Sequence, residues 1–419
     1  MMSHGYDPES AGRAIKAPMY LTSTFSFAKA EEGKAYFELA YGLREKEAEE
    51  KLGMIYSRID NPNLSMLESR LCLWDQAEDC AVFQSGMAAI STVLLEFLSP
   101  GDLLLYSSPT YGGTDHFITH FLRKIGVECL GFRSGDTKED IIKMVEASGK
   151  ADRLSFIYLE TPANPTGGLF DIEMCREIAD CFGTEEQRVH LAVDNTYMGP
   201  LWSHPLQLGA DLVLYSATKY IGGHSDLLAG AVLGAAPLMK RVKTLRTFLG
   251  SMASPHTSWL LLRSLETLKI RMEQQARNAA AIAELLNDHP AVGKVLYLGN
   301  LQPGTRDYDI YQRQYTSPGA MIAFEVVGGE KAAFQFLNTL KLIKIAVSLG
   351  GTESLIEHPG TMTHIGVCPE LKEELGINES LVRLSVGVEN SLDLMRDIET
   401  ALAEVRMTQP QPKFILAEV

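Results

Sequence analysis

The sequence contains no run of about 18 consecutive apolar residues, and its N-terminal stretch, MMSHGYDPESAGRA, is polar. The first absence excludes a helix that spans a membrane, and the second predicts that no signal peptide is present. Basic residues are in the minority, since the formal net charge is -15. This balance disfavours nucleic acid or an anionic membrane as the main partner, although local cations can still bind a small anion.

Motifs for metals, disulfides and dinucleotides are also missing. The six cysteines include no CxxC pair, which argues against a zinc knuckle or a disulfide framework and predicts a reducing, cytoplasmic location. His116 and His120 have the i, i+4 spacing of a zinc helix, but the glutamate of HExxH is absent, so we expect no metal. The glycines around Gly222 do not form GxGxxG after a first strand, so a dinucleotide site is not expected.

The 419 residues are too many for one small core and predict two domains with extensions. Residues 1–64 are interpreted as an arm, with a charged helical segment from Ala28 to Leu52. An arm without its own core usually packs on a neighbouring subunit, so an oligomer is expected. Residues 65–265 form the main domain and residues 266–419 a second, α+β domain. A long helix from Thr257 to Asp288 leads into the second domain, and the tail from Met407 is expected to be peripheral.

Short apolar runs alternate with helical stretches in the main domain. Continuous apolar runs of this kind predict a mainly parallel sheet that is buried on both faces, and therefore an α/β fold. The predicted strands are Cys80–Phe83, Leu103–Tyr106, Val127–Gly131, Ser155–Leu159, His190–Val193, Leu212–Tyr215 and Gly230–Leu233. In the second domain, strands are predicted at 320–327, 343–347 and 381–388, with helices at 330–340 and 391–406. Ligands of such sheets bind beyond the carboxyl ends of the strands.

The most informative strand end is Ser216 to His224, which follows the strand Leu212–Tyr215. Ser216 and Thr218 can hold a phosphate beside the amine of Lys219. An amine next to a phosphate suggests pyridoxal phosphate held as a Schiff base, whereas the simpler alternative is a solvated surface lysine.

Two earlier strand ends offer further contacts to a ring and a phosphate. Ser85, Gly86 and Met87 open a helix, where free backbone N–H groups can bind phosphate, although a plain strand-to-helix turn has the same pattern. Tyr111 lies among small residues, where its ring can lie flat over a planar group and its hydroxyl can act as an acid. A tyrosine packed in a turn is the alternative.

The next two strand ends carry Asn164 and Asp194. Asn164 can donate to a ring oxygen, but Asn-Pro is also a frequent turn pair. A carboxylate at the end of a buried strand needs a partner, and a protonated pyridine nitrogen would pair Asp194. A helix cap is the alternative for Asp194.

Two arginines lie away from these strand ends. Tyr56 and Arg58 are two residues apart in extended chain, so they point the same way, and arginine binds phosphate with two hydrogen bonds. Arg383 lies within an apolar strand of the second domain and needs a partner there. A substrate carboxylate would serve, and so would a structural Asp or Glu.

In this order and spacing the motifs resemble the Cys/Met-metabolism pyridoxal-phosphate enzymes, over about residues 15–405. That family includes cystathionine γ-synthase, cystathionine γ-lyase, methionine γ-lyase and O-acetylhomoserine sulfhydrylase. The motifs that carry the resemblance are YSR, QSGMAAI, TYGGT, ETPANPTG, DNTY, SATKYIGGH, SLGGTESLIEHPGTMTH and VRLSVGVE.

The resemblance implies the aspartate-aminotransferase fold (pyridoxal-phosphate fold type I), with a seven-stranded, mainly parallel sheet domain and a smaller α+β domain. It implies a homotetramer made of two tight dimers that share active sites. It also implies γ-elimination or γ-replacement on a sulfur-containing or O-acylated homoserine-type amino acid, through a vinylglycine intermediate. A non-catalytic binding protein on the same fold is the alternative from another class.

The resemblance also assigns roles. Lys219 is the Schiff-base lysine, and Tyr111 stacks on the ring and acts as the acid. Asp194 pairs the pyridine nitrogen, and Asn164 lies near the ring hydroxyl. The residues that bind the phosphate within the subunit are Ser85, Gly86, Met87, Ser216 and Thr218. The residues that reach the phosphate of the neighbouring subunit are Tyr56 and Arg58. The residues that hold the substrate carboxylate are Ser348 and Arg383.

Two departures from the family pattern concern the substrate. Methionine γ-lyases carry cysteine where Gly113 stands, which weakens the interpretation as a dedicated methionine lyase. Members that handle cystathionine usually carry glutamate where Val347 stands, so a partner for the distal amino group of cystathionine is missing. The segment from Ala28 to Leu52 is also longer than expected and can reshape the entrance. The identity of the γ substituent therefore stays open.

Overall fold

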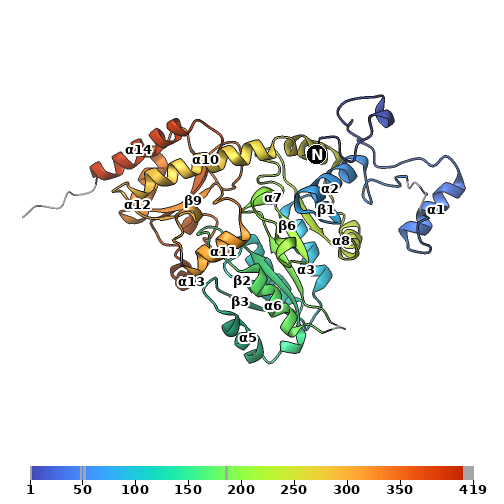
Figure 1. The fold of residues 1–419 in the computed structure, drawn as a ribbon, viewed down its shortest axis with the longest axis horizontal. Coiled ribbons are helices and arrows are strands. Elements are labelled where there is room, and N and C mark those ends of the chain that lie inside the picture. Colours follow the sequence, from blue (N-terminus) through green and yellow to red (C-terminus); the bar gives the residue numbers. More distant parts are fainter. Residues whose placement is uncertain (1, 48–49, 51–52, 185–186, 409–419) are drawn as a thin grey trace, which may run out of the picture.

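Two β-sheets organise the chain in the computed structural model, which describes residues 2–47, 50, 53–184 and 187–408 (Figure 1). The larger sheet has seven strands in the order β1-β7-β6-β5-β4-β2-β3. Its strands are β1 (Asp79–Phe83), β2 (Leu103–Ser107), β3 (Glu128–Phe132), β4 (Leu154–Glu160), β5 (His190–Asp194), β6 (Leu212–Tyr215) and β7 (Gly230–Gly234). Each predicted strand of this domain is present, with ends that differ by at most one residue.

The pairing within the larger sheet is mostly parallel. Strands β3, β2, β4, β5 and β6 pair in parallel, whereas β7 runs antiparallel to both β6 and β1. Strand β1 therefore points the same way as β2 to β6, and the carboxyl ends of all these strands meet at one edge. The predicted mainly parallel α/β sheet is confirmed, and its one reversed strand is β7.

Helices cover both faces of this sheet. Helix α3 (Gly86–Phe97) and helix α8 (Ala236–Leu249) contribute to the hydrophobic core on one face, through residues such as Val93 and Val242. Helix α5 (Lys138–Ala147) and helix α6 (Ile172–Phe182) bury Val145 and Ile178 in the core on the other face. This double coverage explains why the strands are continuous apolar runs.

The smaller sheet has the order β10-β11-β12-β9-β8. Its strands are β8 (Val292–Leu296), β9 (Met321–Val326), β10 (Lys344–Ile345), β11 (Leu355–Glu357) and β12 (Leu381–Ser385). Strands β8 and β11 were not predicted: β8 is partly exposed and lacks an apolar run, and β11 is only three residues long. The predicted strands at 343–347 and 381–388 are shorter than expected.

The remaining helices complete the outline of the chain. They are α1 (Ala30–Ala40), α2 (Pro62–Asp75), α4 (Gly112–His116), α7 (Gly199–Trp202), α9 (Pro255–Leu265), α10 (Leu268–Asn287), α11 (Arg306–Gln314), α12 (Gly329–Thr339), α13 (Pro369–Glu374) and α14 (Ser391–Thr408). The short helical segments are η1 (Pro8–Ala11), η2 (Phe117–Leu122), η3 (Ala151–Arg153), η4 (Pro205–Leu208), η5 (Leu298–Asn300) and η6 (Pro359–Thr361). Figure 1 shows α10 running from the larger-sheet body to the smaller sheet. The tail from residue 409 lies outside the described residues.

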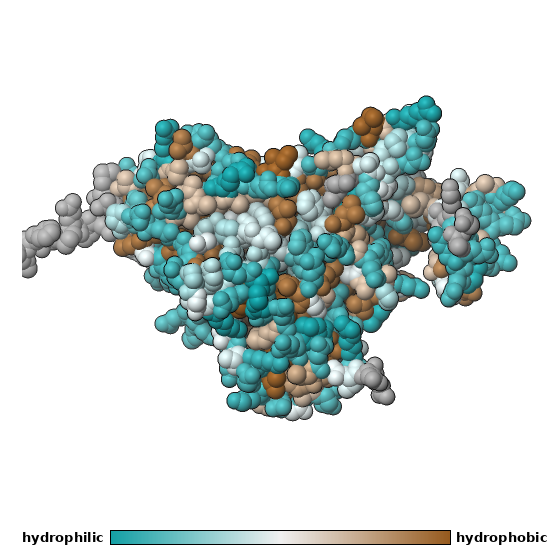
Figure 2. Space-filling view, viewed as in Figure 1, coloured by the Kyte–Doolittle hydropathy of each residue, from teal (hydrophilic) through white to brown (hydrophobic). Residues whose placement is uncertain are grey.

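The predicted helix from Ala28 to Leu52 is wrong in length. Helix α1 ends at Ala40, and Gly42 follows with a φ of 66°, a left-handed conformation that ends helices. Residues 41–47 and 50 are not helical, and residues 48–49 and 51–52 lie outside the described part of the chain. Phe37 and Tyr41 leave 44% and 76% of their surface exposed. Helix α1 lies on a lobe that stands off the body (Figure 1 and Figure 2).

The predicted helix from Thr257 to Asp288 is two helices, α9 and α10, with a break at Glu266–Thr267. The side chain of Arg271 reaches back across the break and donates from Nη2 to the carbonyl of Ser264, at 3.1 Å. The same carbonyl also accepts from the N–H of Thr267, at 3.2 Å, so this carbonyl at the end of α9 has partners without a continuous helix. Within the described residues, no helix combines the length and apolar character needed to cross a bilayer.

Candidate active site

Lys219 lies in the turn that follows β6, at the carboxyl edge of the larger sheet. Its amine donates to Oγ of Ser348, at 2.8 Å, so a residue of the second domain reaches the strand-end lysine. Ser348 has a φ of 94°, an uncommon conformation for a residue other than glycine, and such strained positions concentrate at functional sites. Burial, with a smaller contribution from Arg383, lowers the pKa of the Lys219 amine to about 8.

A group of four residues next to Lys219, here called the cradle, joins the start of α3 to the end of β6. It consists of Gly86, Met87, Ser216 and Thr218. A Cβ on Gly86 would lie 2.9 Å from the Cβ of Ser216, so the close approach of α3 to the turn requires glycine. Ser85 caps α3 by accepting from the N–H of Ala88. The N–H groups of Gly86 and Met87 precede the first bonds within the helix and are free to bind an anion.

The hydroxyl of Thr218 was expected to be available to a phosphate, but it already makes two hydrogen bonds. It donates to the carbonyl of Ala229, at 3.2 Å, and accepts from the N–H of the same residue, at 3.0 Å. Thr218 therefore already ties the Lys219 turn to the segment before β7. To contact a phosphate as well, the Thr218 hydroxyl would have to share its one hydrogen between the phosphate and the carbonyl of Ala229.

Asp194 ends β5 and is buried beside the cradle. Its Oδ2 accepts from the hydroxyl of Tyr158, at 3.1 Å, and its Oδ1 accepts from the N–H of Thr196, at 3.0 Å. Burial raises the pKa of Asp194, so the carboxylate has a strong need for a cationic or N–H partner. The hydroxyl of Thr196 also accepts from the N–H of Ser216, which fixes the distance between β5 and the Lys219 turn.

A second buried carboxylate, Glu160, lies opposite Asp194 on the neighbouring strand β4. Its Oε2 accepts from the N–H of Tyr111, at 2.6 Å, and its Oε1 accepts from the N–H of Asn164, at 3.1 Å. Burial and the neighbouring charge of Asp194 raise the pKa of Glu160 to about 8. Glu160 thus holds together the two loops that carry Tyr111 and Asn164, a role that the sequence did not reveal.

Arg383 approaches the site from β12 of the smaller sheet. Its Nη1 donates to Oδ1 of Asn164, at 2.8 Å, and its Nη2 donates to the carbonyl of Ser348, at 2.7 Å. Nη1 also forms a 2.7 Å ion pair with Glu357, a residue that sequence reasoning missed. Asn164, which was expected to contact a ring oxygen, therefore also accepts from the guanidinium of Arg383. The structural acid considered as a partner for Arg383 is present as Glu357.

Tyr111 and Val347 border this cluster and are accessible. Tyr111 leaves 45% of its surface exposed, and Val347, which precedes Ser348, leaves 54%. A Cβ on Gly113 would lie 2.7 Å from the ring of Tyr111, so a cysteine at this position would require the ring to move. The glycine in TYGGT therefore allows the position that Tyr111 adopts here.

Tyr56 and Arg58 are not brought to the cradle of their own chain. Cζ of Arg58 lies 5.7 Å from the ring centroid of Tyr56, as expected for side chains that point the same way. The guanidinium donates from Nη1 to the carbonyl of Thr247 on α8, at 2.9 Å. Both residues are exposed on the arm.

The two histidines of α4 and η2 stack on each other. The ring centroids of His116 and His120 are 4.0 Å apart. Among the residues that the structure describes, no group of three or more His, Cys, Asp or Glu side chains could hold a metal ion.

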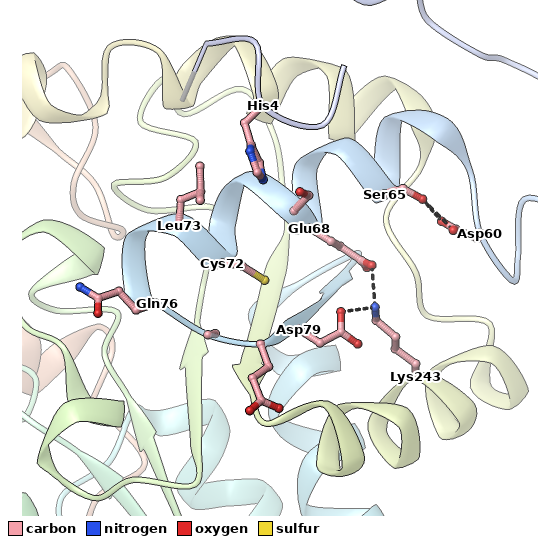
Figure 3. A pocket seen from close by; sticks show the side chains of 12 residues that line it. His4, Asp60, Ser65, Glu68, Cys72, Leu73, Gln76, Asp79 and Lys243 are labelled. Atoms are coloured by element: carbon pink, nitrogen blue, oxygen red, sulfur yellow. Dashed lines mark hydrogen bonds and ion pairs between the residues drawn. The ribbon is translucent and has the colours of Figure 1, made fainter. Parts of the chain in front are cut away.

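A cavity of about 630 Å³ lies elsewhere, between α2, β1 and α8 (Figure 3). Within it Lys243 contacts both Glu68, at 3.1 Å, and Asp79, at 2.6 Å, and Ser65 bonds to Asp60. One lysine thus pairs with two of the acidic side chains that line the cavity. None of the predicted site residues lines this cavity.

Three comparisons with known proteins all indicate the same enzyme family. The model of a family described as Cys/Met metabolism PLP-dependent enzymes matches residues 1–403. An L-methionine gamma-lyase from Pseudomonas putida is 41% identical over 401 residues, which is 95% of each chain. A cystathionine gamma-lyase from Bacillus subtilis is 37% identical over 407 residues, which is 97% of this chain and 98% of the relative. A solved structure of cystathionine gamma synthase from Xanthomonas oryzae has a TM-score of 0.85 at 33% identity, covering 97% and 98% of the two chains.

These comparisons decide several of the expectations. The predicted fold type I architecture is confirmed, and so are the predictions of an enzyme and of pyridoxal phosphate as its cofactor. The predicted γ-elimination or γ-replacement is confirmed for the family as a whole. The chain therefore belongs to the Cys/Met metabolism PLP-dependent enzymes.

Proposed function

We propose that this chain removes or replaces the γ substituent of a sulfur-containing or O-acylated homoserine-type amino acid, with Lys219 as its cofactor lysine. One observation carries the proposal: Lys219 and Arg383 are joined through Ser348, which contacts the amine with its hydroxyl and the guanidinium with its carbonyl. The amine for the cofactor and the guanidinium for the substrate carboxylate therefore contact the same residue, Ser348.

The residues present fit pyridoxal phosphate. The cradle has no room for a side chain at Gly86 and offers N–H groups and the Ser216 hydroxyl to a phosphate. Asp194, whose pKa burial raises, supplies the carboxylate that a protonated ring nitrogen needs. Tyr111 is exposed enough to lie on a ring, and the side-chain nitrogen of Asn164 remains available to a ring oxygen.

When bound, pyridoxal phosphate supplies an electron sink for the α-carbon of the substrate. Lys219 holds the cofactor and afterwards moves the proton at that carbon. Its lowered pKa favours this role, because an ordinary lysine stays protonated until about pH 10. Tyr111 is placed to give a proton to the leaving group, and Arg383 and Ser348 orient the substrate carboxylate.

We also propose that the active site is shared between subunits of a homotetramer. The cradle residues are uncharged, and a phosphate with two negative charges is better held with a cation. Arg58 and Tyr56 of the neighbouring subunit would supply one, since both lie exposed on the arm of residues 1–64. Residues 65–265 would then be the cofactor-binding domain and residues 266–419 the second domain. The six unpaired thiols are consistent with the cytoplasm.

Methionine-like thioethers are the leading substrates, although Gly113 stands where methionine γ-lyases carry cysteine. The relatives named L-methionine gamma-lyase support this choice, and the exposed apolar side chain of Val347 beside Ser348 suits an uncharged γ substituent. Replacement with a thiol remains the second candidate, supported by the similarity to a cystathionine gamma synthase.

A substrate panel tests both candidates. The purified protein is incubated with methionine, homocysteine, cystathionine and O-acetylhomoserine, with and without added thiol. Release of 2-oxobutanoate from methionine supports elimination, and thioether formation from O-acetylhomoserine supports replacement. Absence of both products from a yellow, cofactor-loaded protein would favour a binding protein on the same fold.

A further inference from the structure

Arg383 has five N–H donors, and two of them make hydrogen bonds to residues that the structure describes. Nη1 donates one hydrogen to Asn164 and forms the ion pair with Glu357, and Nη2 donates one hydrogen to the carbonyl of Ser348. The Nε–H is buried without a hydrogen-bond partner among the described residues. Two donors, on Nε and Nη2, therefore remain for a ligand that can accept both.

Glu357 is fixed from two sides. It lies directly opposite Arg383 in the antiparallel pairing of β11 and β12, and it is fully buried. Its Oε1 accepts from the hydroxyl of Thr363, at 3.0 Å, and pairs with Arg383. Its Oε2 has no hydrogen-bond partner in the part of the chain that the structure describes. The pair thus uses one oxygen and one nitrogen, and not the two parallel bonds that a carboxylate and a guanidinium can form.

The location of this pair distinguishes it from an ordinary structural ion pair. The guanidinium contacts Ser348, whose hydroxyl holds the Lys219 amine. The segment that carries Thr363 packs against the start of α4, since a Cβ on Gly112 would lie 2.9 Å from the carbonyl of Thr363. Glu357 therefore links Arg383 to the loop next to Tyr111, inside the site.

We propose that Glu357 is a positioning residue for Arg383. It holds Nη1 in place, so that the donors on Nε and Nη2 stay available for the carboxylate of the amino-acid substrate. This inference rests on the proposed role of Arg383 as the group that binds that carboxylate. Glu357 itself touches neither the substrate nor the cofactor.

The substitutions Glu357→Ala and Glu357→Gln separate positioning from charge. Alanine removes the oxygen that holds Nη1. Glutamine keeps an oxygen for Arg383 and Thr363 and places its NH₂ where Oε2 has no partner, so no contact is lost. The exposed Glu330 on α12 offers matched controls, Glu330→Ala and Glu330→Gln.

Two analogues of methionine, each lacking one of its two charged groups, serve as probes of the cofactor-loaded enzyme. The first, 4-(methylthio)butanoate, carries the carboxylate and no amine, and its binding is measured by calorimetry. The second, 3-(methylthio)propylamine, carries the amine and no carboxylate, and its binding is measured by visible absorption. Loss of a charged hydrogen bond typically weakens binding by about ten-fold or more.

We expect Glu357→Ala to weaken the binding of 4-(methylthio)butanoate by about ten-fold or more, and the binding of 3-(methylthio)propylamine by less than about two-fold. KM for methionine should rise more than kcat falls. Glu357→Gln should stay within about three-fold of the wild type, and the Glu330 variants should not change. An unchanged carboxylate affinity in Glu357→Ala, or equal weakening of both probes, would overturn the proposal.

If Glu357→Ala does not fold, Glu357→Asp replaces it, because the shorter side chain keeps the charge but withdraws the oxygen. It should weaken the carboxylate probe while Glu357→Gln does not, and the reverse order contradicts positioning. Arg383→Lys tests the underlying assumption separately. If that variant binds the carboxylate probe as the wild type does, the role of Arg383 fails, whatever Glu357 does.

Discussion

Burial changes the acid–base behaviour of the residues at the centre of the site in opposite directions. It lowers the pKa of the Lys219 amine to about 8, and it raises the pKa of the Asp194 carboxyl. Both changes favour neutral forms until a charged partner arrives. The sequence predicted Lys219 and Asp194 because each follows an apolar strand. Glu160 also follows a predicted apolar strand, but its role depends on the backbone N–H groups that it accepts from, and the role of Glu357 depends on its pairing with Arg383. Neither contact is indicated by the residues around a single strand end.

The lowered pKa of Lys219 can be measured without the cofactor. In the cofactor-free protein, labelling of Lys219 by acetic anhydride should rise with pH around a midpoint of about 8, because only the neutral amine reacts. The labelled peptides are quantified by mass spectrometry, with surface lysines of the same digest as internal controls. A midpoint for Lys219 near 10, the range of ordinary lysines, would contradict the burial argument.

At the scale of elements, the contact between α3 and the turn after β6 forms the cradle. Gly86→Ala should weaken pyridoxal phosphate binding by about ten-fold or more, because the new methyl group would press on Ser216. Cofactor affinity is measured by fluorescence titration of the cofactor-free protein. Gly135→Ala is the matched control, since a Cβ there meets no atom within 4 Å. Equal affinity of the two variants would show that the cradle tolerates a side chain.

Another link between elements joins the end of α2 to the end of β6. The hydroxyl of Tyr215 donates to the carboxyl of Asp75, at 2.8 Å, and burial raises the pKa of Asp75 from 3.8 to about 7. The folded state keeps this proton at a pH where the unfolded state has lost it. The contribution of Asp75 to stability is therefore greatest at low pH and falls as pH rises from about 4 to about 7, by up to about 4 kcal/mol.

Asp75→Asn should remove that pH dependence, because the amide keeps an acceptor for Tyr215 and carries no charge. The difference in Tm between the variant and the wild type should shift in favour of the variant between pH 5 and pH 8. Thermal unfolding at the two pH values measures it. Parallel changes of Tm with pH in both proteins would contradict a buried, titrating Asp75.

The elements also show where sequence patterns suffice. The strands of the larger sheet were predictable because both faces are covered, so each strand is an uninterrupted apolar run. Strand β8 is partly exposed and β11 has three residues, so neither carries such a signal. The charged segment after Ala40 has helix-forming residues, but Gly42 ends the helix there. The side chain of Arg271 bonds across the break between α9 and α10, a contact that no local pattern indicates.

At the scale of the whole molecule, the proposed sharing of active sites predicts complementation. Lys219→Ala and Arg58→Ala should each reduce activity strongly, since one removes the cofactor lysine and the other a phosphate ligand of the neighbouring site. In co-expressed mixtures, about a quarter of the sites should combine an intact Lys219 with an intact Arg58 from the partner. Activity of the mixture above that of either variant supports the shared site. No recovery in mixed oligomers, verified by two affinity tags, would contradict it.

The most direct test of the whole account asks which lysine carries the cofactor. The yellow protein is treated with borohydride, which fixes pyridoxal phosphate to its lysine, and is then digested and analysed by mass spectrometry. The account predicts that the modified peptide contains Lys219 and that Lys219→Ala yields no modified peptide. Modification of a different lysine, or none in a protein that turns over methionine, would contradict it.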